Sequence, residues 1–328
     1  GRRIFISIMK YSLIIEGAGA VLLSIAFVPQ HGGFGVWMGV FTSVTAFCNA
    51  GFDLCGIEGA FSSLTNHQSD PLVLITVALL IMIGGLGFIV WENFLNLRKV
   101  KKLSLHTKCV LIMTALLTVG GTLLYLFAEW DNPATLGNMN FGEKLLNAFF
   151  SSVTARTAGY NSIPVDGMSD FTLLGSCILM FIGACPASTG GGIKATTLLV
   201  LIMTVVSYLR SKNDVEILHH KIDKLAVYRT LTVTILSLTA VIICFSVLYF
   251  TLPDEVSGVN CLFEAVSAFS TAGLSVGVTA VSGTAGKILL MLTMYIGRVG
   301  PVSLVLSMLM NASKRKNLVV PEGQIIVG

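Results

Sequence analysis

Three segments of the sequence share a twelve-residue pattern whose final residues could bind a cation through backbone oxygen atoms. The segments read F-T-S-V-T-A-F-C-N-A-G-F (41–52), F-F-S-S-V-T-A-R-T-A-G-Y (149–160) and F-E-A-V-S-A-F-S-T-A-G-L (263–274). They align without gaps on a shared Ala-Gly, whose glycines are Gly51, Gly159 and Gly273. Small residues are also common where membrane helices pack, but the threefold register favours a functional repeat.

The chemistry that such loops can perform is cation binding by carbonyl groups. A potassium ion leaves water only if oxygens replace its hydration shell, and rings of backbone carbonyls do this. Glycine permits the dihedral angles and the close approach of chains that these loops need. The predicted potassium filter comprises four residues of each pattern: Cys48, Asn49, Ala50 and Gly51; Arg156, Thr157, Ala158 and Gly159; Ser270, Thr271, Ala272 and Gly273.

A second signature follows each loop at a similar distance. It reads M-I-G-G-L-G at 82–87, F-I-G-A-C-P at 181–186 and Y-I-G-R-V-G at 295–300. Each repeat is therefore interpreted as an outer helix, a short helix, an Ala-Gly loop and an inner helix. A short helix of about 12 residues covers only about 18 Å, so it cannot span a membrane. Irregular backbone at membrane depth must be enclosed by protein or line a wet cavity, which indicates a re-entrant pore loop.

The composition requires a membrane environment for these elements. Hydrophobic residues make up 54% of the chain and charged residues only 12%, about half the charge of a typical soluble protein. Long apolar runs, most of them near the ~20 residues of a spanning helix, recur along the chain. They lie near 11–28, 72–91, 109–128, 171–185, 195–209, 230–251 and 285–311.

The basic residues predict which side of the membrane each loop faces. Of the 21 Lys and Arg residues, 16 fall in four clusters, at 2–10, 98–108, 210–229 and 314–316. The positive-inside rule places these clusters in the cytoplasm. Residues 29–70 contain no Lys or Arg, which makes the opposite face acidic and attractive to cations. Because the basic residues do not form one patch, the net charge of +4 does not indicate nucleic-acid binding.

The predicted fold is an all-α integral membrane protein built from pseudo-symmetric repeats. Since each repeat has both an outer and an inner helix, successive repeats share one orientation and form a ring, unlike inverted-repeat transporters. The predicted repeats occupy 1–97, 98–212 and 213–313, and a cytoplasmic tail occupies 314–328.

These motifs resemble those of the Trk/Ktr/HKT superfamily. The resemblance is carried by T-A-R-T-A-G-Y-N (154–161), A-S-T-G-G-G-I-K (187–194), F-S-T-A-G-L (269–274) and Y-I-G-R-V-G-P (295–301). The tail P-E-G-Q-I-I-V-G is most like that of a bacterial Ktr-type membrane subunit. The resemblance implies potassium uptake across a bacterial plasma membrane. Members have four repeats around one pore, so the three found here would be the second to fourth, and we expect the first to precede Gly1.

The resemblance also implies a gate below the filter. Three glycines in a row are a poor helix, and the run at 190–192 reads either as a packing kink or as a flexible gating segment. Gly190, Gly191, Gly192 and Lys194 match the family's intramembrane gate loop. A charge inside a membrane helix is rare and expensive. By resemblance Arg298 faces the pore as a barrier to cations, and its alternative is a structural salt bridge to an acid such as Glu16.

The resemblance further implies partners. Ktr-type members resemble homodimers that dock on a cytosolic ring of nucleotide-binding regulatory subunits. The basic loops 92–108 and 209–229 and the tail are the expected docking surfaces. We expect no cofactor on this chain itself, potassium as substrate with sodium as a second candidate ion, and nucleotide only through the partner.

Other functions are less well supported by the sequence. An enzyme is disfavoured because no nucleotide-binding loop, H-E-x-x-H motif or catalytic constellation is present. A transporter for an organic substrate would also use broken helices, but matched loops of one orientation argue against it, and a purely structural protein would not explain them. Arg156 and Glu264 either pair across adjacent repeats or each meet backbone or water. His219 and His220 read as solvated surface, and the seven cysteines fit no metal or disulfide spacing.

Overall fold

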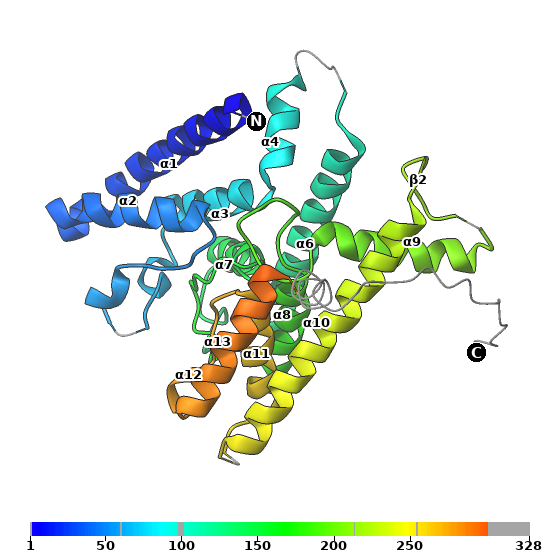
Figure 1. Cartoon of the computed structure of the whole chain (residues 1–328). Helices are drawn as coiled ribbons and strands as arrows, with labels where there is room; N and C mark the ends of the chain where they lie inside the picture. Colours follow the sequence, from blue (N-terminus) through cyan, green and yellow to red (C-terminus); the bar gives the residue numbers. More distant parts are fainter. Residues whose placement is uncertain (1, 60, 98–101, 213, 254, 301–328) are drawn as a thin grey trace.

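The chain folds almost entirely into helices (Figure 1). This computed structural model describes residues 2–300 except 60, 98–101, 213 and 254. The predicted tail at 314–328 and the end of the last predicted apolar run therefore lie outside the described residues. Within the described part, three helices are long and apolar enough to cross a membrane: residues Ile6–His31 of α1 (Arg2–His31), α6 (Leu105–Ala128) and α10 (Lys224–Thr251).

Each long helix is followed by a short one that ends at an Ala-Gly loop. The short helices are α2 (Gly33–Phe47), α7 (Phe141–Thr154) and α11 (Gly258–Ser270), with 15, 14 and 13 residues. The start of α7 is fixed by a capping box, because Asn140 and Glu143 each bond to the other's backbone N–H. The side chain of Ser257 caps α11 in a similar way. All three short helices contact the long helix before them.

The inner helices are interrupted rather than continuous. The apolar run 72–91, which we predicted as one inner helix, is divided into α3 (Pro71–Gly85) and α4 (Phe88–Leu95), whose axes differ by 91°. Gly87 makes the break with a φ of 88°, which a side chain would disfavour. The same φ, 89°, recurs at Gly300, which ends α13 (Thr284–Val299) at the equivalent position of its signature. The apolar run 72–91 therefore forms two helices with a sharp bend between them rather than one.

The middle inner helix is broken by a loop instead of a bend. It consists of α8 (Asp170–Phe181) and α9 (Ala195–Leu209), with the glycine run between them. This loop reaches the bend of the first inner helix, since the Phe88 amide donates to the Ala187 carbonyl and the Cys185 amide to the Gly85 carbonyl, at 3.0 and 3.2 Å. Breaks in neighbouring inner helices therefore lie against each other.

The short helices interlock successive units of the chain. Besides its own long helix, α7 contacts α3, and α11 contacts both α8 and α13. In Figure 1, α7, α8 and α11 lie at the centre of the molecule, with α1 and α10 toward its outside. The interior between them is filled by large buried side chains, including Tyr125, Phe150 and Phe263. The Ala-Gly loops are thus attached to a rigid core of close-packed helices.

The remaining described elements are small. Two one-turn helices, η1 (Cys55–Ile57) and η2 (Thr65–His67), lie in the segment after Gly51, and α12 (Val278–Val281) follows Gly273. A hairpin of β1 (Glu216–Ile217) and β2 (His220–Lys221) joins α9 to α10, with Glu216 opposite Lys221. His219 and His220 are exposed at this hairpin.

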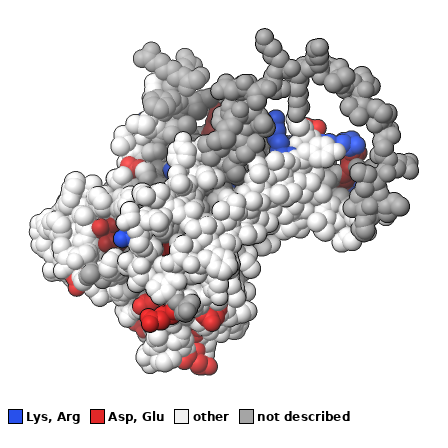
Figure 2. Space-filling view, turned by 60° about the horizontal axis from the view of Figure 1, so that its bottom comes forward, with Lys and Arg blue, Asp and Glu red and all other residues white. Residues whose placement is uncertain are grey.

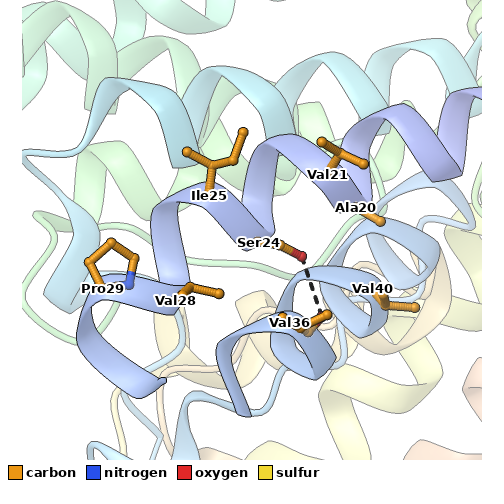
Figure 3. A pocket seen from close by; sticks show the side chains of 8 residues that line it. All are labelled: Ala20, Val21, Ser24, Ile25, Val28, Pro29, Val36 and Val40. Carbon is orange, nitrogen blue, oxygen red and sulfur yellow. Dashed lines mark hydrogen bonds between the residues drawn. The ribbon is translucent and has the colours of Figure 1, made fainter. Parts of the chain in front are cut away.

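The outer surface is that of a membrane protein. Large apolar side chains are exposed along α10, among them Ile235, Ile242 and Phe250, and a water-soluble protein rarely exposes such extended apolar surface. An open apolar groove of about 470 Å³ lies between α1 and α2 (Figure 3). In Figure 2, most of the visible acidic residues gather toward the bottom, and a broad uncharged surface separates them from the basic residues at the upper right.

Candidate cation pathway

The three Ala-Gly loops adopt one backbone conformation. In each, the glycine and the residue two positions before it have positive φ, whereas the alanine between them does not. The sign of φ therefore alternates along each loop in the same way. The residues with positive φ are Asn49 and Gly51 (50° and 72°), Thr157 and Gly159 (69° and 89°), and Thr271 and Gly273 (52° and 82°).

The three filter glycines meet at one place, with Gly159 between the other two. A Cβ built on Gly159 would lie 2.8 Å from the Ala272 carbonyl oxygen and 3.4 Å from the Cα of Gly51. A Cβ on Gly273 would lie 3.2 Å from the Cα of Gly159, and one on Gly51 would overlap the Ala158 carbonyl oxygen. No side chain fits at these positions, because the loops approach each other through their backbones.

A hydroxyl from each short helix braces its loop. The hydroxyl donates to the carbonyl oxygen of the residue directly after the filter glycine: Thr45 to Phe52 at 2.8 Å, Thr154 to Tyr160 at 2.6 Å, and Ser267 to Leu274 at 2.6 Å. Tyr160 also joins two loops, since its hydroxyl lies within hydrogen-bond distance of the Thr45 hydroxyl and, at 3.0 Å, of the Phe52 carbonyl oxygen. Our reading of the sequence missed these braces, although a Ser or Thr five or six residues before each glycine was visible in the alignment.

Three side-chain oxygens near the loops have no hydrogen-bond partner among the residues that the structure describes. They are Asn49 Oδ1, Thr157 Oγ1 and Thr271 Oγ1, all buried and all at the same position of the repeat. A buried oxygen without a partner is costly. Together with free carbonyl groups, such oxygens are the ligands that a dehydrated alkali cation accepts. The same position of each repeat therefore offers an unpartnered oxygen beside its loop.

The glycine run lies directly against these residues. A Cβ on Gly190 would overlap the Thr157 hydroxyl, and one on Gly191 would lie 2.5 Å from the Thr271 hydroxyl. The Lys194 ammonium donates to the Gly190 carbonyl oxygen at 2.6 Å and so closes the run into a loop. The structure thus brings Gly190, Gly191 and Lys194 together with two of the three filter loops.

The signature glycines let the inner helices touch the ends of the short helices. A Cβ on Gly84 would overlap the Phe47 carbonyl oxygen, and one on Gly297 would overlap the equivalent carbonyl of Phe269. Gly183 differs, because its nearest neighbour is the Gly191 carbonyl oxygen. In the middle unit, the signature glycine Gly183 therefore contacts the glycine run instead of the end of its own short helix.

Comparisons with known proteins agree with this architecture. The TrkH family, described as cation transport protein, matches residues 3–317 of the chain. This chain belongs to the TrkH family of cation transport proteins. It is 40% identical to the potassium/sodium uptake protein NtpJ of Enterococcus hirae over 99% of this chain and 72% of that protein. It is 36% identical to the Ktr system potassium uptake protein B of Bacillus subtilis over 97% of this chain and 70% of that protein.

The fold is also that of a solved TrkH structure. The potassium transporter TrkH from Vibrio parahaemolyticus superimposes with a TM-score of 0.73 over 92% of this chain and 63% of that one, at 16% identity. The resemblance to the Trk/Ktr family and the all-α membrane fold are therefore confirmed. Membership in a TrkH family of transport proteins also confirms the prediction of a transporter rather than an enzyme.

The charged residues of this TrkH family member do not all lie as the sequence suggested. Arg156 and Glu264 do not pair, because the Arg156 guanidinium donates to Thr118 at 2.8 Å, whereas Glu264 accepts from Ser275 at 3.0 Å and from Thr279. Ser270, at the same position as Arg156, bonds back to Val266 at 2.6 Å. The side chains of Arg156, Glu264 and Ser270 therefore bond to groups near their own loops rather than across adjacent repeats.

The remaining charged residue of the predicted site, Arg298, is exposed in the final turn of α13. Among the described residues no acid lies within ion-pair distance of it, so the structure shows no salt bridge to Glu16. Arg298 is near enough to Lys194 for the two positive charges to repel each other. The gate loop and the end of the last inner helix thus both present a positive charge.

Proposed function

We propose that this chain takes up potassium through a filter formed by the loops that end at Gly51, Gly159 and Gly273. The proposal rests above all on the matched backbone of the three loops, which meet through their glycines. The relatives from Enterococcus hirae and Bacillus subtilis are named as potassium/sodium and potassium uptake proteins, which supports potassium as substrate. Sodium is the second cation to test.

In this mechanism the carbonyl groups of the four filter residues in each loop replace the water around the ion. The C-terminal ends of α2, α7 and α11 point toward the loops, so their dipoles favour a cation there. The hydroxyl braces hold the carbonyl after each glycine against its short helix, which fixes the direction of the carbonyls before it. Rigid carbonyl geometry is what lets a filter prefer one cation over another.

The glycine run is proposed as the gate. Gly190, Gly191 and Gly192 lie against Thr157 and Thr271 and are free of side chains that would hold a regular helix. An ion that leaves the filter meets this loop first. Flux then requires the loop to move, and the bond from Lys194 to Gly190 opposes that movement.

Regulation and assembly are proposed by resemblance. The chain acts as a homodimer on a cytosolic nucleotide-binding ring, with the basic loops 92–108 and 209–229 and the tail as docking surfaces. This places the basic loops and the C-terminus in the cytoplasm of a bacterial plasma membrane. The Bacillus subtilis relative is named as part of a Ktr system, which supports a multi-component assembly.

The filter is tested by measuring potassium and sodium uptake, with rubidium as a potassium tracer, into proteoliposomes that hold the purified full-length protein. The wild type should take up potassium far faster than sodium, and Gly273→Ser should lose much of this preference. The matched control is Gly283→Ser, because nothing lies within 4 Å of a Cβ at Gly283. Uptake of an organic solute without potassium flux would show a different transporter, and an unchanged ion preference in Gly273→Ser would remove the filter assignment.

A further inference from the structure

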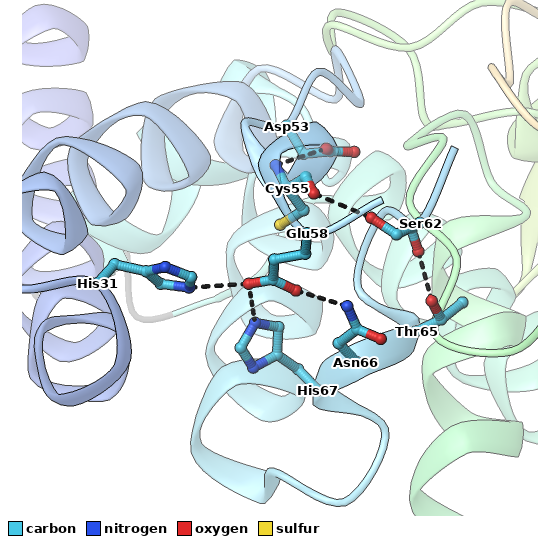
Figure 4. Close-up of polar contacts among 8 residues, drawn as sticks. All are labelled: His31, Asp53, Cys55, Glu58, Ser62, Thr65, Asn66 and His67. Atoms are coloured by element: carbon cyan, nitrogen blue, oxygen red, sulfur yellow. Dashed lines mark hydrogen bonds and ion pairs between the residues drawn. The ribbon is translucent and has the colours of Figure 1, made fainter. Parts of the chain in front are cut away.

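A second group of cation ligands lies outside the filter, in the segment that follows Gly51. His31 is the last residue of α1, Glu58 follows η1, and His67 ends η2. Figure 4 shows both imidazole rings directed at the same carboxylate oxygen. The ligand atoms of the three residues all lie within 4.8 Å of one another. Residues up to 36 positions apart in the chain thus form one compact cluster.

Three ligand atoms of the cluster have no hydrogen-bond partner in the part of the chain that the structure describes. The His31 Nε2 lies 2.8 Å from Glu58 Oε1, and the His67 Nε2 lies 3.6 Å from the same oxygen. Neither of these two approaches has hydrogen-bond geometry. His31 Nε2, His67 Nε2 and Glu58 Oε1 are therefore buried atoms without a hydrogen-bond partner among the described residues. His67 is 2% exposed, which makes its free nitrogen expensive.

The surroundings hold the three groups ready. Asn66 donates to the other carboxylate oxygen, Glu58 Oε2, at 2.7 Å and so turns Oε1 toward the histidines. The edge of the Phe27 ring packs on His67 at 5.1 Å between centroids.

Two of the three distances between ligand atoms bracket the spacing of a tetrahedral metal site, and all three lie within 4.8 Å. Ligands about 2.0–2.2 Å from zinc at tetrahedral angles lie roughly 3.4 Å apart, between the two distances measured here. Two imidazoles and one carboxylate suit zinc and similar transition metals, whereas calcium and magnesium take mainly oxygen ligands. An amide that fixes the ligating carboxylate is a common support for such sites.

We propose that His31, Glu58 and His67 bind a divalent transition-metal ion of the zinc class, with the fourth position open to water. The ion joins the end of α1 to the segment between Gly51 and α3. That segment also contacts the second filter loop, since the Leu64 amide donates to the Asn161 carbonyl at 3.0 Å and the Asn161 amide to Ser63 at 3.3 Å. The bound metal thus stiffens the entrance above two filter loops.

The test is calorimetric titration of zinc into the purified, chelator-treated full-length protein. The background carries His219→Gln and His220→Gln, which removes the exposed pair at the hairpin. We expect one zinc per chain, with an affinity at least about tenfold weaker in His31→Gln and in Glu58→Gln. Cobalt titrated into the same proteins should give the visible absorption of a tetrahedral site, and this band should be lost in both variants.

The matched control is Asn138→Ala, which changes a polar side chain of another loop on the same background. It should keep the zinc affinity of the parent. Thermal unfolding without metal shows whether each variant is folded. His31→Gln is the deciding variant, because His67 is deeply buried and its substitution risks unfolding the protein. Absence of zinc binding in the parent, or equal affinity in parent and His31→Gln, would overturn the site. The assay measures binding only, so a failure of the transport proposal leaves it unaffected.

Discussion

The hydroxyl of Thr154 donates to the carbonyl oxygen of Tyr160 across 2.6 Å, and both groups are fully buried. This bond fixes the backbone on the outer side of Gly159 to the helix that carries the loop. Equivalent bonds exist in the other two loops, so the braces are a property of the repeat. Two further predictions follow from the backbone around the filter and two from the charges below it.

The first prediction concerns the Thr154 brace. Thr154→Val keeps the shape of the side chain but leaves the buried Tyr160 carbonyl without its donor, at a cost of about 1–3 kcal/mol. We expect the loop to lose its fixed carbonyl direction and the potassium-over-sodium preference to fall about tenfold, measured by competitive uptake into proteoliposomes.

The control for this prediction is Thr232→Val on the exposed face of α10, where the hydroxyl bonds only to its own helix. It should leave selectivity unchanged. If Thr154→Val retains wild-type selectivity in a folded protein, the brace does not set the geometry of the filter.

The second prediction concerns the contact between α13 and the end of α11. Gly297→Ala places a methyl group on the Phe269 carbonyl oxygen, which is backbone and cannot move without the filter loop. We expect a loss of stability of about 1–3 kcal/mol, typical of overpacking, together with reduced uptake. Thermal unfolding in detergent and uptake by the same preparation provide the measurements.

Gly120→Ala is the matched control, because Gly120 is also in a helix and nothing lies within 4 Å of its Cβ. Removing a helical glycine there should be neutral or slightly stabilising. Equal stability of the two alanine variants would mean that α13 can shift away from α11 without cost.

Much of this architecture was predictable because the pattern repeats in the sequence. A glycine recurring at one register in three segments predicts a shared backbone requirement, and the structure gives all three a positive φ. The long outer helices were visible as apolar runs. Local sequence patterns could show these features, because the length of an apolar run and the dihedral freedom of a glycine are local properties of the chain.

Contacts between distant segments were not predictable in this way. The apolar run 72–91 gave no sign of a 91° bend, because Gly87 breaks the helix to admit the carbonyl of Pro186, almost 100 positions away. Pairing of Arg156 with Glu264 was one of two alternatives, yet each side chain bonds to hydroxyl groups near its own loop instead. The cluster of His31, Glu58 and His67 arises where the segment after Gly51 folds back on the end of α1, and no spacing in the sequence indicated it.

The third prediction concerns the closure of the glycine run. Lys194→Met keeps the length of the side chain but removes the bond to the Gly190 carbonyl. Without it the run is free to leave Thr157 and Thr271, so we expect faster flux that responds less to the regulatory partner. Deletion of Gly190–Gly192 should act in the same direction.

The measurement is potassium flux into proteoliposomes with and without the regulatory partner, at equal amounts of protein. Lys212→Met provides the control, because that lysine pairs with Glu216 on the exposed hairpin at 2.6 Å. Flux that falls to nothing in a folded Lys194→Met protein would assign the lysine a structural role instead.

The fourth prediction concerns Arg298, whose guanidinium stays charged in almost any environment. Its side chain is exposed, it lies near the like charge of Lys194, and no described acid is within ion-pair distance of it. A fixed positive charge about 6 Å from a potassium ion opposes it by about 3 kcal/mol at an effective dielectric constant near 20. Such a barrier lowers occupancy about a hundredfold, yet a modest movement of a long side chain relieves it. Arg298→Ala should therefore speed uptake at saturating potassium, whereas Arg298→Lys, which keeps the charge, should change it much less. Initial rates of uptake into proteoliposomes measure both. Equal rates for wild type and Arg298→Ala would show that this charge does not limit conduction.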